Sequence, residues 1–259
     1  MLRERPMTTS SPGLRQAVSE RRLEDVAMRH DDGMLPTAFD HLMAAGRTAV
    51  LSGDHAIEGA PAETGRWGPS VVFLPNGPVA AALGRLILEV VEILSERHWP
   101  SRGLGRAHIT VRALEPYIES IPQDRAARYV AAMTRALRDI GSARLEVVGV
   151  GLSPSGVMAC AVSVDGAADR LRHRLNEELG DDGWLERTVF EHGRDPIWYC
   201  TLVHFAEPIL DPGKLVTWAD QRISWGFGPA IFDSVALCTW SFDGEAMIPR
   251  TIASVASTA

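Results

Sequence analysis

Ala107-His-Ile-Thr-Val-Arg-Ala-Leu-Glu-Pro116 and Trp198-Tyr-Cys-Thr-Leu-Val-His-Phe-Ala-Glu-Pro208 are two similar stretches of this chain. Each is rich in apolar and β-branched residues, which predicts a strand, and each ends in Glu-Pro before a segment of helical periodicity. Thr110 and Thr201 are separated by the same number of positions as His108 and Tyr199. The match predicts a weak internal duplication, in which two pseudo-symmetric lobes face one cleft.

The chain around these stretches alternates between strand and helix signals. Strands are predicted at 71–74, 107–114, 143–150, 156–164, 197–205, 230–240 and 246–253, and helices at 78–94, 124–140, 166–179 and 211–223. Asp124 and Asp211 stand where side-chain caps would begin two of the helices. This order mixes hairpins with crossovers, so it predicts an α+β fold: two lobes with antiparallel or mixed sheets lining a central cleft, and helices outside.

The first part of the chain differs in composition from the rest. Its apolar periodicity predicts short helices at 11–33 and 36–45, the second ending at Gly46 as a C-terminal cap. Residues 52–69 are rich in glycine, proline and alanine, as linkers are. We therefore divide the chain into an N-terminal helical extension with its linker, 1–66, and a main domain, 67–257.

Composition limits the classes of protein that fit. The chain has 259 residues with 46% hydrophobic and 23% charged residues, which is ordinary for a globular protein. The most apolar stretch, 79–91, is interrupted by Gly84, Arg85 and Glu89, so no membrane span is expected. The N-terminus lacks the apolar core of a signal peptide, which favours a cytoplasmic protein. A net charge of −7 argues against a protein that coats long RNA.

Side-chain alternation turns the two strands into a candidate site. His108, Thr110 and Arg112 are expected on one face of the first strand, and an imidazole, a hydroxyl and a guanidinium in a row suit a phosphate group. On the second strand Tyr199 and Thr201 share a face with Val203. His204 is expected to point away; a one-residue bulge would turn it inward, but the register of Thr201 with Thr110 argues against one.

Further candidates lie near the second strand. His192 and Arg194 belong to a polar loop that precedes it, where site residues often occur. Trp198 and Trp225 are the tryptophans best placed to stack on a flat ligand, and Cys200 is expected in the core. Histidine, cysteine and carboxylate spacings match no metal pattern, so neither a metal nor another cofactor is expected.

At these residues the sequence resembles the 2H phosphoesterase superfamily, which includes 2′-5′ RNA ligase-like proteins and 2′,3′-cyclic phosphodiesterases of bacteria. The resemblance covers roughly residues 70–253 and rests on His-Ile-Thr at 108–110, the Thr-Leu-Val strand from Thr201, and the order of elements. It implies a hydrolase with two His-x-Thr motifs, one in each lobe. It implies that His108 transfers a proton and that Thr110 and Thr201 anchor the phosphate. In the mechanism we favour, His108 is the general base, and Arg112, from its expected place on the same strand face, stabilises the charge of the phosphate.

The chain departs from that pattern at Tyr199, which stands where the family has its second histidine. Tyrosine has a pKa of about 10, against about 6.5 for histidine, so it can donate a proton but is a poor base near pH 7. The favoured interpretation is a cyclic phosphodiesterase-like enzyme with a divergent active site. In it Tyr199, or a loop residue such as His192 or Arg194, is the acid, and the ligand is a small phosphorylated or nucleotide-like molecule. Two alternatives stay open: a non-catalytic module that binds a nucleotide or an RNA end, and an enzyme recruited to another reaction of specialised metabolism.

Overall fold

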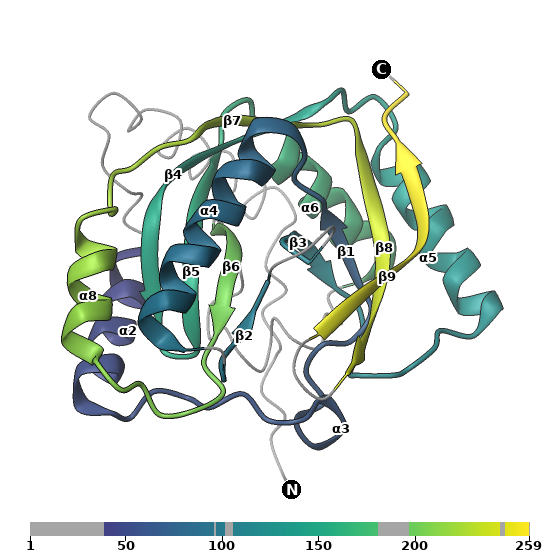
Figure 1. The fold of residues 1–259 in the computed structure, drawn as a ribbon. Coiled ribbons are helices and arrows are strands. Elements are labelled where there is room, and N and C mark those ends of the chain that lie inside the picture. The colour runs from purple at the N-terminus through teal and green to yellow at the C-terminus, as the bar shows by residue number, and fades with distance from the viewer. Residues whose placement is uncertain (1–38, 96, 102–105, 181–196, 244–246, 259) are drawn as a thin grey trace, which may run out of the picture.

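The computed structural model describes residues 39–95, 97–101, 106–180, 197–243 and 247–258. In this part of the chain nine strands form one sheet that curls into a half-barrel, with helices packed around it (Figure 1). The strands are β1 (Ser70–Phe73), β2 (Trp99–Pro100), β3 (Ile109–Ala113), β4 (Ala143–Ser153), β5 (Gly156–Ser163), β6 (Trp198–His204), β7 (Gly228–Phe232), β8 (Ser234–Phe242) and β9 (Met247–Ala256). The helices are α2 (Asp40–Ser52), α3 (Pro61–Thr64), α4 (Gly77–Leu94), α5 (Gln123–Ala136), α6 (Ala167–Leu179) and α8 (Pro212–Asp220).

The sheet consists of two matched halves. Its order is β7-β4-β5-β6-β3-β1-β8-β9, with β2 added beside β6, and each pairing recorded for the described residues is antiparallel. Four strands lie on either side of the junction between β3 and β6, where Ile109 is opposite Cys200. The predicted α+β fold with two pseudo-symmetric lobes is confirmed, and the two similar stretches of sequence are its central strands.

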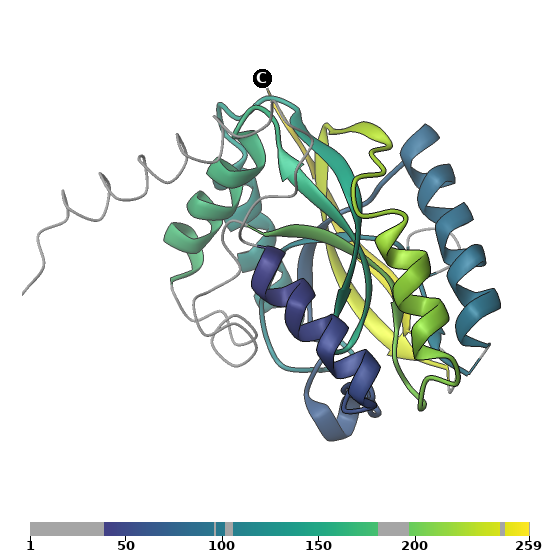
Figure 2. The same ribbon diagram turned by 90° about the vertical axis from the view of Figure 1, so that its left-hand side faces the viewer.

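The two faces of the sheet are covered differently. One face packs on a single large core to which α4, α5, α6 and α8 all contribute (Figures 1 and 2). The other face carries two small apolar clusters, one of them beside α2 and the other on β1 and β8. These clusters comprise Phe39, Met158, Cys160 and Ile197, and Val72, Ala236, Cys238, Trp240 and Met247, respectively. Between them the central strands present the polar side chains described below.

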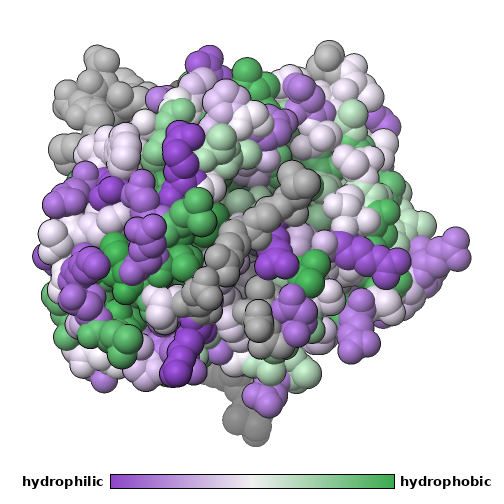
Figure 3. Space-filling view, in the orientation of Figure 1, coloured by the Kyte–Doolittle hydropathy of each residue, from purple (hydrophilic) through white to green (hydrophobic). Residues whose placement is uncertain are grey.

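Local sequence signals predict several elements closely. The apolar run at 71–74 forms β1, and the helix that begins beside Pro78 is α4. The side chain of Asp211 accepts a hydrogen bond from the backbone N–H of Lys214 at 2.9 Å, which confirms it as the cap of α8. Polar and apolar side chains are interspersed over the face of the molecule drawn in Figure 3. Among the described residues no helix is long and apolar enough to cross a membrane.

The sequence predictions about the cap at Asp124 and about the strand at 230–240 are wrong. Asp124 does not cap α5, because the helix begins after Pro122 and Asp124 lies in its first turn, where its charge favours the helix dipole instead. The strand predicted at 230–240 is two strands, because the chain breaks at Asp233. β7 then pairs with β4, whereas β8 pairs with β1 in the other half of the sheet.

The helix predicted at 36–45 continues past its expected end. Gly46 lies inside α2 and is buried against β4, where a Cβ would be only 2.3 Å from the carbonyl oxygen of Leu152. The helix ends instead at Gly53, whose φ of 80° lies in the left-handed region that glycine adopts readily. The helix predicted at 11–33 lies outside the described residues. The division of the chain at residues 66 and 67 stays a prediction.

We expect Gly46→Ala to destabilise the protein, because the added methyl group pushes α2 away from the backbone of β4. A loss of about 1–3 kcal/mol in the free energy of unfolding is typical of such overpacking, and denaturant titration would measure it. Gly84→Ala is the matched control in α4, where a Cβ meets nothing within 4 Å. It should stabilise the protein by about 0.5–1 kcal/mol through helix propensity alone. Equal effects of the two substitutions would contradict the close approach of α2 to β4.

Candidate active site

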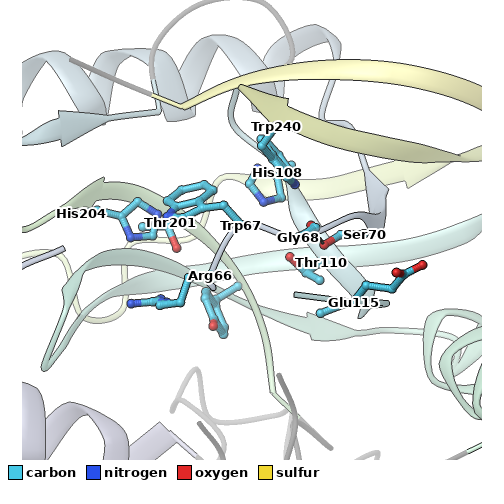
Figure 4. A pocket seen from close by; sticks show the side chains of 12 residues that line it. Arg66, Trp67, Gly68, Ser70, His108, Thr110, Glu115, Thr201, His204 and Trp240 are labelled. Carbon is cyan, nitrogen blue, oxygen red and sulfur yellow. Dashed lines mark hydrogen bonds between the residues drawn. The ribbon is translucent and has the colours of Figure 1, made fainter. Parts of the chain in front are cut away.

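A pocket opens where the two central strands meet. Side chains of β3 and β6 form its floor, and the segment before β1 and the end of β8 add its walls (Figure 4). In the figure His108 and Thr110 lie on one side, and Thr201 and His204 on the other, with Trp67 near them. The twelve lining residues are Arg66, Trp67, Gly68, Ser70, His108, Thr110, Ala113, Glu115, Tyr199, Thr201, His204 and Trp240.

The first strand reaches this pocket through a β-bulge. Val71 of β1 is opposite Arg112, yet the next residue, Val72, is opposite Thr110, so Val111 is an extra residue in β3. Val111 is buried in the main core. After the bulge the alternation changes phase, so His108 and Thr110 line the pocket and Ala113, not Arg112, follows them there.

The second strand has a matching bulge. Val157 and Met158 of β5 are consecutive but are opposite Val203 and Thr201, which makes Leu202 the extra residue of β6. Val203 consequently lies in the main core, and His204 lines the pocket beside Thr201 and Tyr199. The prediction that His204 points away from the site is wrong, because the bulge that we argued against is present. Both bulges directly follow the matched threonines.

Contrary to the sequence prediction, Arg112 does not line the pocket beside His108 and Thr110. It is 4% exposed, and its guanidinium donates hydrogen bonds to the side chain of Asn176 and the carbonyl of Gly180, at the end of α6. The bulge at Val111 gives the reason, because it moves Arg112 out of phase with His108 and Thr110. The pocket contains a different guanidinium, that of Arg66.

Arg172 of α6 supports the bulged strand from behind. Its three guanidinium nitrogens donate to the carbonyls of Val111, Ile197 and Thr110 at 3.1, 3.2 and 3.3 Å. The same guanidinium lies over the ring of Trp198, 3.3 Å from its centroid. Buried carbonyl groups need hydrogen-bond partners, and one side chain supplies them to both central strands.

His108 is oriented by its neighbours. Its Nδ1 is 2.8 Å from the carbonyl oxygen of Arg106, which accepts the hydrogen bond when Nδ1 carries a proton. In the neutral ring this leaves Nε2 as the nitrogen that can accept a proton. The imidazole also packs on Trp240, with ring centroids 4.4 Å apart. The site therefore holds His108 in a defined tautomer, as proton transfer requires.

A buried carboxylate lies behind the side of the pocket that Arg66 and Trp67 line. The side chain of Glu58 is 0% exposed, and it accepts hydrogen bonds from Arg66 Nη1 at 2.7 Å and Trp67 Nε1 at 3.3 Å. Burial raises the pKa of Glu58, although the charge of Arg66 and the hydrogen bond from Trp67 oppose the shift. His204 Nδ1 lies 3.7 Å from Glu58 Oε2. Burial, followed by the charges of Arg66 and His108, lowers the pKa of His204 well below 6.5.

The remaining predicted residues lie away from the pocket or outside the described chain. Trp198 is buried under Arg172 and donates to Asp169 at 2.7 Å, and Trp225 packs beside Phe227; neither lines the pocket. Cys200 lies in the core as expected, where burial raises its pKa to about 12. His192 and Arg194 lie outside the described residues. Within the described ranges no three His, Cys, Asp or Glu side chains gather into a group that could hold a metal ion.

Eight of the twelve lining residues are not among those predicted from the sequence. Arg66, Trp67 and the supporting Glu58 come from a stretch interpreted as linker, and Trp240 from a strand expected to supply core. Tertiary packing brings them to the pocket, and no local periodicity marks them. The one signal available was the pair Leu202-Val203, two adjacent apolar residues that break a strict alternation.

Comparison with known proteins agrees with this geometry at the level of the fold. No protein-family model and no curated protein sequence matches the chain. TT0787 of Thermus thermophilus is structurally similar, with a TM-score of 0.54 and 18% identity over 73% of this chain and 97% of that one. E. coli LigT in its apo form has a TM-score of 0.48 and 15% sequence identity to this chain. A structure described as a phosphoesterase has a TM-score of 0.48 and 12% identity. Each of these two alignments covers 74% of this chain and 99% of the other chain. The chain therefore shares its overall fold with TT0787.

Removing the support behind the bulge tests the role of Arg172. Arg172→Met retains most of the apolar stem but leaves the carbonyls of Thr110, Val111 and Ile197 without their donor. We expect a loss of at least about 2 kcal/mol in the free energy of unfolding, since each buried unsatisfied group costs about 1–3 kcal/mol. Arg170→Met, on the exposed side of the same helix, is the control and should change stability by less than about 0.5 kcal/mol. Similar losses in both variants would contradict this role.

The buried histidines predict how stability depends on pH. Burial lowers the pKa of His98 and of His204, so the unfolded chain binds protons at these positions that the folded protein resists. The free energy of unfolding should therefore fall as the pH decreases through about 6.5, by at most about 1.4 kcal/mol per pH unit for each histidine. Denaturant titrations between pH 7.5 and 5.5 would measure the slope. It should decrease in His204→Gln and stay unchanged in His173→Gln, which alters an exposed histidine; an unchanged slope in the first variant would refute the assignment.

Proposed function

We propose that this protein is a divergent 2H-type phosphoesterase that hydrolyses a small cyclic phosphodiester of the nucleotide type. The observation that carries this proposal is the convergence of His108, Thr110 and Thr201 on one pocket from two adjacent strands. An imidazole can transfer a proton, and two hydroxyls can donate hydrogen bonds to phosphoryl oxygens. The resemblance found in the sequence assigns these same residues to that chemistry.

The size of the pocket supports a phosphoryl group as the bound part of the ligand. Its cavity is about 80 Å³, well below the roughly 300–1,000 Å³ of pockets that enclose a drug-sized molecule. A phosphoryl group with its two ester oxygens would occupy it, and the rest of a nucleotide would extend beyond it. This favours a small ligand or a chain end over a long stretch of RNA.

The character of the lining separates this proposal from its main alternative. An enzyme recruited to unrelated chemistry would be expected to have a cleft lined mainly by apolar and aromatic groups. Eight of the twelve lining residues here have polar side chains. The guanidinium of Arg66 is paired with Glu58, and Glu115 adds a carboxylate, so the support for a phosphoryl ligand comes from hydroxyl and imidazole groups rather than from a net positive charge. A module that binds without turnover has the same lining, so kinetics must distinguish it from an enzyme.

Hydrolysis of a cyclic phosphodiester needs two proton transfers. One removes a proton from the attacking water, and the other supplies a proton to the ribose oxygen that leaves phosphorus. His108 performs one of them, and the hydroxyls of Thr110 and Thr201 hold the phosphate. The second group is provided from the β6 side of the pocket, where sequence analysis predicted Tyr199.

Hydrolysis of a panel of 2′,3′-cyclic nucleotides tests the proposal. We expect turnover by the unaltered protein and a decrease in kcat of about 10²–10⁴-fold in His108→Ala, the usual effect of removing a general acid–base group. His173→Ala, which removes an exposed histidine of α6, should retain full activity. Circular dichroism would show that both variants are folded.

Two outcomes would contradict the proposal. Nucleotide binding without turnover by the unaltered protein would leave a binding module. If the unaltered protein shows no turnover, and inorganic phosphate does not compete for the pocket, the protein is an enzyme of another class. Tyr199→His adds information, since activity gained only in that variant would show a phosphoesterase scaffold that has lost its original reaction.

A further inference from the structure

Glu58 is a buried carboxylate that the predicted mechanism does not use. Each of its oxygens has a donor, because Arg66 Nη1 binds Oε2 at 2.7 Å and Trp67 Nε1 binds Oε1 at 3.3 Å. Its backbone N–H donates to the carbonyl of Phe205 at 2.6 Å, which joins this segment to the end of β6. A buried carboxylate is costly unless it is paired. Besides Arg66, the carboxylate of Glu58 lies beside His204, which lines the pocket.

His204 is held between Glu58 and the pocket. The residue is 8% exposed, and its Nδ1 is buried and has no hydrogen-bond partner among the described residues. Glu58 Oε2 lies 3.7 Å from this nitrogen, slightly beyond hydrogen-bonding distance. The ring is fixed from the side by Trp67, with centroids 4.5 Å apart. Catalytic hydrogen bonds are often long in the free enzyme and shorten when substrate binds.

We infer that His204 is the second proton-transfer residue of the pocket and that Glu58 is its positioning residue. This inference rests on the proposed phosphodiesterase activity and replaces the role predicted for Tyr199. A carboxylate that accepts the Nδ1 proton fixes the tautomer of an imidazole and directs Nε2 to the substrate. The bulge at Leu202 turns His204 into the pocket that His108 also lines.

The charges around His204 determine the direction of transfer. Glu58, Arg66 and His108 are the titratable groups that act on it, and burial with the two positive groups lowers its pKa. His204 is therefore neutral near pH 7, which suits a proton acceptor. The reaction that follows assigns the donor to His108, the reverse of the role predicted from the sequence.

The hydrolysis then balances as follows. His204 takes a proton from water while the water oxygen forms a bond to phosphorus. The bond from phosphorus to one ribose oxygen breaks, and that oxygen receives a proton from the imidazolium of His108. The product is a phosphate monoester, and solvent returns the proton from His204 to His108. The attacking and leaving oxygens lie roughly in line across phosphorus, so the two histidines act from opposite sides.

Kinetics of four single variants on a 2′,3′-cyclic nucleotide test this role. His204→Gln should lower kcat by about 10²–10⁴-fold with little change in KM. Glu58→Gln should lower kcat less and move the acidic limb of the kcat/KM profile to lower pH, because His204 loses the carboxylate that stabilises its protonated form. Tyr199→Phe should lose at most about tenfold, and His173→Gln should match the unaltered protein.

The outcomes separate this inference from the proposed function. No turnover by the unaltered protein would overturn both. Turnover that persists in His204→Gln, or that is lost only in Tyr199→Phe, would overturn the role of His204 and leave the proposed function intact. An unchanged pH profile in Glu58→Gln would overturn the positioning role of Glu58.

A measurement on the unaltered protein keeps the inference testable if His204→Gln fails to fold. The Cε1–H resonance of each histidine can be followed by NMR against pH, with and without inorganic phosphate. His204 should titrate well below pH 6.5, and its resonance should shift when phosphate is added, whereas the resonance of the exposed His173 should not respond to phosphate. A phosphate-insensitive His204 would overturn the inference.

Discussion

The two bulges in the central strands determine the composition of the pocket. Each inserts one residue directly after a matched threonine, Val111 after Thr110 and Leu202 after Thr201. A bulge changes which side chains face which side of a sheet, so every residue after it changes sides. His204 enters the pocket for this reason, and Arg112 leaves it. Regular strands would instead place Arg112 beside Thr110 and Val203 beside Thr201 in the pocket.

Bulges leave carbonyl groups outside the regular ladder, and this protein supplies a partner for them. Arg172 donates to the carbonyls on both sides of the first bulge and to Ile197 beside the second strand. Its guanidinium is covered by Trp198, so the arrangement is closed to water on that side. The backbone that positions the pocket side chains of the central strands is thus stabilised by the buried guanidinium of Arg172. Buried, hydrogen-bonded groups of this kind specify one arrangement of the backbone over its alternatives.

The electrostatics of the pocket follow from residues that lie far from the central strands in sequence. Glu58, Arg66 and Trp67 precede β1, yet they form the wall behind His204. Burial of the carboxylate has a larger effect on its pKa than the neighbouring guanidinium has, so the pKa of Glu58 is raised. The same burial lowers the pKa of His204. The side of the pocket at His204 therefore combines a neutral imidazole with a guanidinium that is paired with a buried carboxylate.

The sequence by itself determined the α+β class, most of the helices and strands, and the matched pair of strands with His108, Thr110, Tyr199 and Thr201. These depend on local patterns, namely apolar periodicity and capping residues such as Asp211. Tertiary structure alone decided the break at Asp233, the position of Gly46, the inward turn of His204 and the wall containing Glu58. The physical reason is that both kinds of feature involve two elements. A bulge is defined by the register between two paired strands, and a close approach is defined by the packing of one element against another. Neither is a property of one local segment, so periodicity along the chain does not determine it.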